Sequence, residues 1–179
     1  MNLDAFLKTV RASKQFNYFY HFTDKKNLDS IRARGLLSAS ELRRLGLIKK
    51  VVTGGDAVSL ATDIQKGNDQ YVCLCFTKNH PMCFVASQRG VDPIEPTWLS
   101  INPDVIKLPD VMVTDAPSNQ NGVVLQEPSQ ALDTMHLDAI YQWIDWSLNP
   151  DARGHRILAE KYEILVPKKV VVDYIVDGL

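Results

Sequence analysis

Residues 18–38 read YFYHFTDKKNLDSIRARGLLS, a segment that starts with aromatic residues and continues through a largely polar run to Gly35. Tyrosine, phenylalanine and threonine favour a pleated, half-buried backbone, so the segment is predicted to begin as a strand. Thr23 or Asp24 can cap a short helix that Gly35 would end. His21 would then lie on a strand beside a helix start. It is either a core histidine bonded to the backbone or a rigidly held ligand-binding side chain.

The composition fits one globular domain over residues 1–179. Hydrophobic residues make up 45% of the 179 and the net charge is −1, so a sizeable core is expected and global attraction to nucleic acid or membranes is not. Any nucleic-acid contact would come from a local patch. No apolar run approaches the roughly 18 residues that cross a bilayer, and the N-terminus lacks a signal-peptide pattern. We expect no membrane partner.

Cysteine usage favours a reducing compartment. Cys73, Cys75 and Cys83 form no CxxC pair, and no histidines follow at the spacing of a metal site. We therefore expect neither a disulfide framework nor a bound metal. A cytoplasmic location is the corresponding expectation.

The middle of the chain is predicted to contain one strong strand after a long loop. Residues 71–76 alternate, with Val72, Leu74 and Phe76 on one face. Residues 49–70 are rich in Gly, Asp, Thr and Asn, which indicates a mobile loop with one helical turn near its end. Outside this region we expect a helix at 3–14, a short capped helix after Ser38, a strand or helix at 82–87, and strands at 98–108 and 111–114.

The last third is predicted to hold a helix followed by two strands. Apolar spacing favours a helix over 134–147, a turn over 149–154, and strands at 162–166 and 170–176. Trp143 and Trp146 lie off the apolar stripe of that helix, so they either pack on a neighbour or form a surface platform. Helices early and late with strands between favour an α+β fold over a doubly wound α/β sheet.

Glu163 is the candidate functional carboxylate of the late strand. It shares a face with Leu165, and a carboxylate flanked by apolar residues is costly to bury unless it is paired or used. The alternative is a solvated glutamate on an edge strand, with Glu160 as a rival. Basic residues crowd the approach to the strand, as a phosphate-binding patch or a solvated face: Arg153, His155, Arg156 and Lys161. Neither a P-loop nor a GxSxG elbow is present.

Three stretches in chain order carry a family resemblance. They are YHFT, NLDSI and GLL at 20–23, 27–31 and 35–37; YVCLCFT and HPM at 71–77 and 80–82; and 156–166, which contains EILV. Together they resemble the DarT-like family of NAD-dependent nucleic-acid ADP-ribosyltransferase toxins. The resemblance implies an ADP-ribosyltransferase-like split mixed β-sheet with an NAD cleft, flanked by short helices. NAD would be the co-substrate.

The resemblance also implies roles for individual residues. Glu163 would be the catalytic carboxylate, because a fixed anion stabilises the oxocarbenium character that develops when the nicotinamide bond breaks and can accept a proton from the attacking base. The residues implied to hold the dinucleotide or wall its nicotinamide end are His21, Thr23, Asn27, Leu36, Tyr71 and Phe76.

One departure from the family pattern concerns a cation. Thymidine-modifying members carry a catalytic arginine in the loop before the second stretch, whereas residues 45–70 here contain only Lys49, Lys50 and Lys66. Lys66 is the expected catalytic replacement, although lysine cannot make a planar bidentate contact. Residues 59–67 look closer to a guanine-modifying or an RNA-modifying branch. The target base therefore stays open.

The leading hypothesis is a toxin that transfers ADP-ribose from NAD to a nucleobase of single-stranded DNA or RNA and releases nicotinamide. Bases in single strands are already exposed, so no flipping is needed. The resemblance further implies an antitoxin, either a macrodomain hydrolase or an inhibitor, and a role in phage defence. Two alternatives stay open: a non-catalytic NAD- or ADP-ribose-binding module on the same fold, and an ADP-ribosyltransferase that acts on protein or RNA phosphate.

Overall fold

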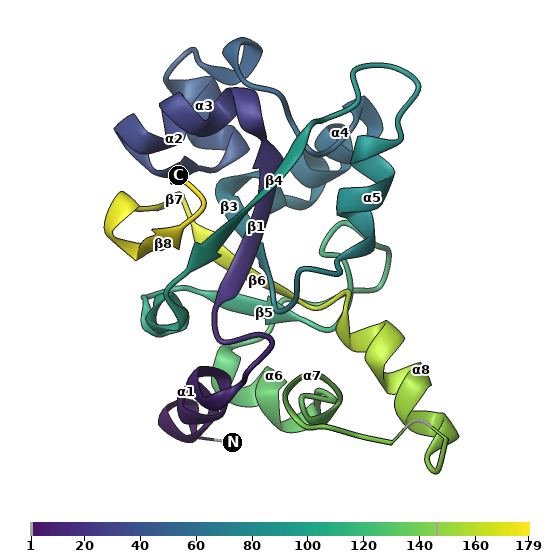
Figure 1. The fold of residues 1–179 in the computed structure, drawn as a ribbon. Helices are drawn as coiled ribbons and strands as arrows, with labels where there is room; N and C mark the ends of the chain where they lie inside the picture. Colours follow the sequence, from purple (N-terminus) through teal and green to yellow (C-terminus); the bar gives the residue numbers. More distant parts are fainter. Residues whose placement is uncertain (1, 146) are drawn as a thin grey trace.

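A six-stranded sheet forms the centre of the protein. The computed structural model describes residues 2–145 and 147–179, and the strands lie in the order β5–β6–β3–β1–β4–β8 (Figure 1). A separate two-stranded sheet pairs β2 with β7. The strands are β1 (Phe19–Asp24), β2 (Leu36–Leu37), β3 (Tyr71–Cys75), β4 (Pro96–Ile101), β5 (Met112–Thr114), β6 (Glu163–Pro167), β7 (Lys169–Val170) and β8 (Ile175–Asp177). The α+β prediction is confirmed.

The large sheet is split between β1 and β3. Strands β1 and β4 pair along their whole length, and β3 and β6 pair over all five residues of β3. In contrast, β1 and β3 share the single Cα pair Tyr20↔Cys75. All pairings of the described strands are antiparallel, so the expected split is present but the expected mixed sheet is wrong. Antiparallel pairing does not require the long crossover connections that parallel neighbours need.

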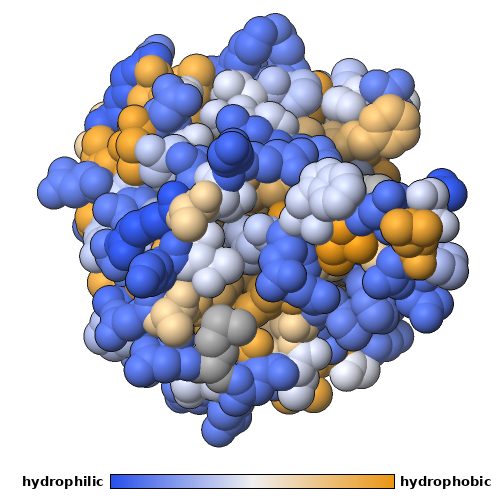
Figure 2. Space-filling view, turned by 60° about the horizontal axis from the view of Figure 1, so that its bottom comes forward, coloured by the Kyte–Doolittle hydropathy of each residue, from blue (hydrophilic) through white to orange (hydrophobic). Residues whose placement is uncertain are grey.

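Short helices cover the two ends and one side of the sheet. In Figure 1, α1, α6 and α7 lie at one end, α2, α3 and α4 at the other, and α5 and α8 along a side. Figure 2 shows mainly hydrophilic residues on the face at the α1, α6 and α7 end, with hydrophobic residues in small separate groups. The helices are α1 (Leu3–Ala12), α2 (Leu28–Arg34), α3 (Ala39–Arg44), α4 (Ala57–Lys66), α5 (Pro81–Ser87), α6 (Pro128–Thr134), α7 (Asp138–Tyr141) and α8 (Pro150–Ala159).

An aromatic cluster joins α1 to the sheet. Phe6 and Phe19 lie with ring centroids 6.3 Å apart, and Phe76 meets the ring of Phe19 edge-on at 5.5 Å. Tyr162 adds a further edge contact to Phe76 at 6.1 Å. These rings are almost fully buried, and burial of large aromatic side chains is a main contribution to the stability of a core. The cluster holds β1 and β3 together at the end where the two strands pair.

The region predicted as a long loop contains a ten-residue helix. Asp56 caps α4 by accepting a hydrogen bond from the Ser59 amide, and Gly67 ends it with φ of 73°. None of its residues is buried, although Ala57, Leu60, Ala61 and Ile64 have the spacing of one helix face. The sequence prediction missed the helix because it gave more weight to the Gly, Asp, Thr and Asn content of the region. Short 3₁₀ turns flank it, η2 (Ile48–Lys50) and η3 (Asn68–Gln70).

The prediction of one helix over 134–147 is wrong. Helix α6 ends at Thr134 and α7 has only four residues, while the predicted turn at 149–154 is the first half of α8. The side chain of Trp143 is 87% exposed, and Trp146 lies outside the described residues. Elsewhere 82–87 is helical, and the predicted strands at 98–108 and 170–176 are interrupted by η4 (Pro103–Lys107) and η5 (Val172–Tyr174). The strands predicted at 71–76 and 162–166 are confirmed.

Within the described residues, no helix is both long enough and apolar enough to cross a membrane.

Candidate active site

A cavity of about 270 Å³ opens where β1 and β3 diverge. Its lining comes from β1 and the segment that follows it through α2, β2 and α3, from the 51–55 segment and α4, from β3 and the start of α5, and from the 117–119 segment and β6. Five of the predicted site residues line it together: His21, Thr23, Asn27, Leu36 and Glu163. An imidazole from an early strand and a carboxylate from a late strand therefore share one cavity.

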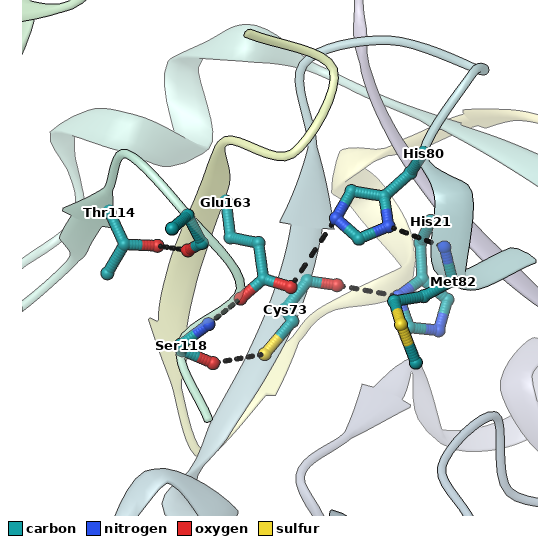
Figure 3. Close-up of polar contacts among 8 residues, drawn as sticks. His21, Cys73, His80, Met82, Thr114, Ser118 and Glu163 are labelled. Carbon is teal, nitrogen blue, oxygen red and sulfur yellow. Dashed lines mark hydrogen bonds and ion pairs between the residues drawn. The ribbon is translucent and has the colours of Figure 1, made fainter. Parts of the chain in front are cut away.

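His21 bridges the split in the sheet. Its Nδ1 lies 2.9 Å from the carbonyl oxygen of Cys73, on β3 (Figure 3). Because a carbonyl only accepts, Nδ1 carries the hydrogen and Nε2 is left as an acceptor. Burial lowers the pKa of His21, and the bond to Cys73 acts in the opposite direction. The backbone-bonded histidine and the cavity-lining histidine that the sequence offered as alternatives are thus the same side chain.

Glu163 is buried in the wall opposite His21. Its residue is 8% exposed, between Cys75 on β3 and Thr114 on β5 in the sheet. The Ser118 amide donates to Oε2 at 2.8 Å. The pKa of Glu163 is raised to about 7, mainly by burial and to a smaller extent by the charge of Asp63, while the hydrogen bonding of Ser118 acts in the opposite direction. Near neutral pH the side chain is therefore close to half ionised, which suits a group that must be an anion and then take up a proton.

His80 is the site residue that the sequence analysis missed. Its Nε2 lies 3.6 Å from Glu163 Oε1, and the residue is 3% exposed. Its Nδ1 accepts the Met82 amide at 3.3 Å, as the N-cap of α5, with Pro81 at the first helical position. A histidine directly before a proline was the available signal for a helix cap, but its approach to β6 depends on the tertiary fold.

Asn27 fixes the 51–55 segment of the cavity wall. Its Nδ2 donates to Thr23 Oγ1 at 3.0 Å and to the Val52 carbonyl at 2.7 Å, and its Oδ1 accepts the Val52 amide at 2.9 Å. Arg89 supports the same segment by donating to the carbonyl groups of Thr53 and Gly54. The segment is thus held from two sides.

Three predicted site residues lie outside the cavity lining. Phe76 is 1% exposed within the aromatic core. Tyr71 is the first residue of β3, paired with Pro167. Lys66 donates from Nζ to the carbonyl groups of Asn119 and Gln120, both at 2.8 Å. The structure therefore does not support Phe76 and Tyr71 as pocket walls or Lys66 as a cation directed into the site.

The basic residues before β6 also lie away from the cavity. Arg156 pairs with Glu160 at 3.1 Å and donates to the Ala139 carbonyl at 2.9 Å, while the ring of His155 stacks on that of His136. The rival carboxylate, Glu160, is therefore occupied elsewhere. Among the residues that the structure describes, no lysine or arginine lines the cavity, and no cluster of three or more His, Cys, Asp or Glu has the arrangement of a metal site.

A family model described as ssDNA thymidine ADP-ribosyltransferase, DarT, matches residues 20–177. The chain belongs to the DarT family. The match to DarT includes nearly all of every strand that contributes to the cavity. It leaves out only the N-terminal region with α1 and the last two residues.

Individual DarT relatives are distant in sequence. A Thermosipho africanus (strain H17ap60334) DNA ADP-ribosyl transferase-DNA ADP-ribosyl glycohydrolase fusion protein is 22% identical over 165 residues, which cover 90% of this chain and 42% of that protein. The chain thus spans about two fifths of the length of this relative.

Solved DarT structures share the fold. Thermosipho africanus DarTG in complex with ADP-ribose matches with a TM-score of 0.64 and 20% identity, over 88% of this chain and 42% of that one. Thermus sp. 2.9 DarT in complex with ADP-ribosylated ssDNA matches with a TM-score of 0.56 and 19% identity, over 91% of this chain and 82% of that one. The same protein in complex with NAD+ matches with a TM-score of 0.55 and 21% identity, over 92% of this chain and 81% of that one. The α+β architecture with its split sheet is therefore that of DarT.

Proposed function

We propose that this protein transfers ADP-ribose from NAD to a nucleobase of single-stranded DNA and releases nicotinamide. The observation that carries the proposal is the single cavity shared by His21 and Glu163. The family description and the likeness to Thermus DarT solved with NAD+ and with ADP-ribosylated ssDNA support it. We take residues 1–179 as one ADP-ribosyltransferase domain that acts in the cytoplasm, where it would reach DNA.

The β1 side of the cavity is proposed to bind NAD. The free Nε2 of His21 is an acceptor, which suits a ribose hydroxyl. Thr23 and Asn27 would frame the dinucleotide, with Asn27 acting mainly through the segment that it fixes. Leu36, buried and cavity-lining, would supply an apolar wall.

Glu163 is proposed to act on both halves of the transfer. The bond from ribose C1′ to the nicotinamide nitrogen breaks, its electron pair leaves with nicotinamide, and the ionised carboxylate stabilises the positive charge at C1′. A ring nitrogen of the base then bonds to C1′ from the opposite face, and its proton passes to Glu163 and on to water. Burial beside Ser118 places the carboxylate without rearrangement.

Lys66 is proposed as an anchor instead of a catalytic cation. It holds the carbonyl groups of Asn119 and Gln120, and Asn68 holds that of Ser118 at 2.9 Å. The same segment delivers the Ser118 amide to Glu163. Lys66 would therefore influence the reaction through the position of that amide.

The decisive experiment incubates the purified chain with NAD labelled on its adenine. Oligo-dT, oligo-dA, oligo-dC and a G-containing single strand would be compared with duplex DNA and RNA. We expect label on single-stranded DNA and release of nicotinamide, neither of which Glu163→Gln should give. Intact NAD and unlabelled nucleic acid, with a folded protein, would contradict the proposal. Mass spectrometry of the product would identify the base, or reveal protein or RNA phosphate as the acceptor.

A non-catalytic NAD- or ADP-ribose-binding module is the second candidate. The observation that favours it is the lack of any lysine or arginine in the cavity lining of the described residues, because the family resemblance implies an arginine there. Stabilisation of the protein by NAD in a thermal-shift assay, without release of nicotinamide, would support this candidate over the enzyme.

A macrodomain-type glycohydrolase is the proposed antitoxin, in a toxin–antitoxin pair directed against phage. Support comes from the Thermosipho africanus relative, whose chain fuses a DNA ADP-ribosyl transferase to a DNA ADP-ribosyl glycohydrolase. Incubation of labelled DNA product with a purified macrodomain hydrolase would test this partner. Loss of label from the DNA is the expected result, and a stable modification would exclude reversal by such an enzyme.

A further inference from the structure

The two oxygens of Glu163 have different surroundings. Oε2 accepts a full hydrogen bond of 2.8 Å from the Ser118 amide. Oε1 faces the imidazole of His80, whose Nε2 is 3.6 Å away, slightly beyond hydrogen-bond length (Figure 3). A small movement of either side chain would therefore form a hydrogen bond between His80 Nε2 and Glu163 Oε1.

His80 has a proton available at the nitrogen that faces Glu163. Its Nδ1 accepts the Met82 amide, so in the neutral ring the hydrogen must be on Nε2. That atom is buried and has no hydrogen-bond partner among the residues that the structure describes. A buried donor without a partner is unfavourable, and catalytic contacts that are long in a ligand-free site shorten when substrate binds.

The orientation of the His80 ring is fixed by its surroundings. Pro81 starts α5 directly after it, and the N-cap bond to Met82 sets the direction of the ring. Phe22, which also lines the cavity, stacks beside the imidazole at 6.3 Å and 28°. The ring thus remains aimed at β6.

We propose that His80 is a positioning residue for Glu163, which donates its Nε2 hydrogen to Oε1 and thereby favours the ionised carboxylate. The inference rests on the proposed function, since it assigns Glu163 the role of an anion. Together with Ser118, His80 would leave each carboxylate oxygen with one donor. Such a pair of donors fixes the plane of the carboxylate relative to the ribose.

The electrostatics around the pair agree with a neutral donor. The pKa of His80 is lowered to about 4, mainly by burial; a contact with the Lys161 backbone opposes this shift and the charge of Lys161 adds to it, so the imidazole is uncharged near neutral pH. Burial and the charge of Asp63 on α4 both raise the pKa of Glu163 and so oppose its ionisation. The thiols of Cys73 and Cys75 on β3 also line the cavity, and burial raises the pKa of each well above its usual value, so both stay neutral. His80 and Ser118 are then the donors that counter the burial of the carboxylate.

The test compares His80→Leu, which keeps bulk but has no donor, with His80→Gln, which keeps a donor at similar reach. Carbon-13 NMR of the Glu163 carboxyl, assigned by its absence in Glu163→Gln, gives the titration midpoint. We expect His80→Leu to raise the midpoint by about one pH unit, as for loss of a hydrogen bond to a charged group, and His80→Gln to stay near the wild type. An unchanged midpoint in a folded His80→Leu protein would overturn the proposal.

A measurement on the unmodified chain guards against a variant that does not fold. Nitrogen-15 NMR of histidine should show His80 with its hydrogen on Nε2 and a shift that follows the Glu163 titration. Hydrogen on Nδ1, or no response to Glu163, would overturn the proposal.

Activity gives a separate readout. The acid limb of the pH profile for labelling of single-stranded DNA should move with the NMR midpoint in His80→Leu, with kcat lowered more than the KM for NAD changes. A limb that stays in place while the midpoint moves would contradict the role in catalysis. Absence of labelling by the wild type would refute the proposed function, whereas the NMR result would still decide the His80–Glu163 contact.

Discussion

The two walls of the cavity differ in how completely their polar groups are paired. On the β1 side, His21 bonds to Cys73 across the split, and Asn27 uses both ends of its amide. On the β6 side, Glu163 is buried with a raised pKa, and His80 keeps a nitrogen without a partner among the described residues. We infer that side chains with complete hydrogen bonding set the binding geometry, whereas the chemistry depends on groups that gain partners only during the reaction.

Removing the charge from the β6 wall should have the largest effect. Glu163→Gln keeps the shape of the side chain, so we expect NAD binding to persist and transfer to fall at least ~100-fold, as for loss of a group that stabilises transition-state charge. Single-turnover labelling of DNA measures the loss, and a thermal shift with NAD measures binding. A Glu163→Gln protein with near-normal transfer would move catalysis to another residue.

The same substitution should alter the dependence of stability on pH. In the unfolded chain the glutamate ionises near its ordinary pKa of 4.5, whereas in the folded protein its pKa is about 7. Its contribution is therefore fully present below pH 4.5 and is lost as the pH rises through 7, a loss of about 3 kcal/mol by linkage. Denaturant melts of Glu163→Gln should not show this loss. Parallel curves for the two proteins between pH 5 and 8 would contradict the raised pKa.

Removing the hydrogen bonds of Asn27 on the β1 side of the cavity should mainly lower the stability of the protein. Asn27→Ala leaves the Val52 backbone groups without partners, which should lower the free energy of unfolding by roughly 1–3 kcal/mol and loosen the 51–55 segment. Asn149→Ala is the matched control, because Asn149 is exposed and makes no side-chain cap bond. Denaturant melts and hydrogen exchange of Val52 measure both effects. Equal behaviour of the two variants would show that the clamp is unimportant.

His21→Ala should act mainly on NAD affinity. Loss of the proposed acceptor to the ribose should weaken NAD binding about tenfold, while a fully assembled complex still reacts. Calorimetry with NAD measures the change, and kcat at saturating NAD should fall much less. A fall in kcat with unchanged affinity would place His21 on the chemical side of the cavity.

Lys66→Met should give the smallest effect. If Lys66 only anchors the Asn119 and Gln120 carbonyl groups, its loss should slow transfer a few-fold, as expected when an exposed lysine loses two charge-assisted hydrogen bonds away from the reacting atoms. Lys26→Met, at an exposed position of η1 (Lys25–Asn27), is the control. A loss as large as that of Glu163→Gln would restore the catalytic cation expected from the sequence.

The family resemblance supplied the predicted site residues, whereas strand periodicity predicted only which face of a strand each side chain occupies. Alternation in residues 71–76 placed Cys73 and Cys75 on the face opposite Phe76, and both cysteines line the cavity. The same alternation contradicts Phe76 as a pocket wall, because it points the ring into the core. Alternation around Glu163 likewise gave its face, although not the burial that shifts its pKa.

The features that were missed depend on contacts that leave no periodic signal. Helix α8 buries only Ala152 and Ala159, so it shows no strong apolar stripe. Helix α4 has apolar residues at helical spacing but buries none of them, and the polar residues around it favoured the prediction of a loop. The approach of His80 to Glu163 joins the start of α5 to β6, far apart in the chain. The direction of Lys66 depends on where the segment after β5 returns.

The His21 side chain bonds to the carbonyl oxygen of Cys73, which would otherwise accept a backbone hydrogen bond from a neighbouring strand. Because the imidazole occupies that carbonyl oxygen, β1 and β3 do not continue their backbone pairing beyond Tyr20. The opening therefore exists before any dinucleotide arrives, and no backbone hydrogen bonds need to be broken to admit one. Capture of NAD should accordingly follow lock-and-key kinetics, with an association rate proportional to NAD concentration and without a slow opening step.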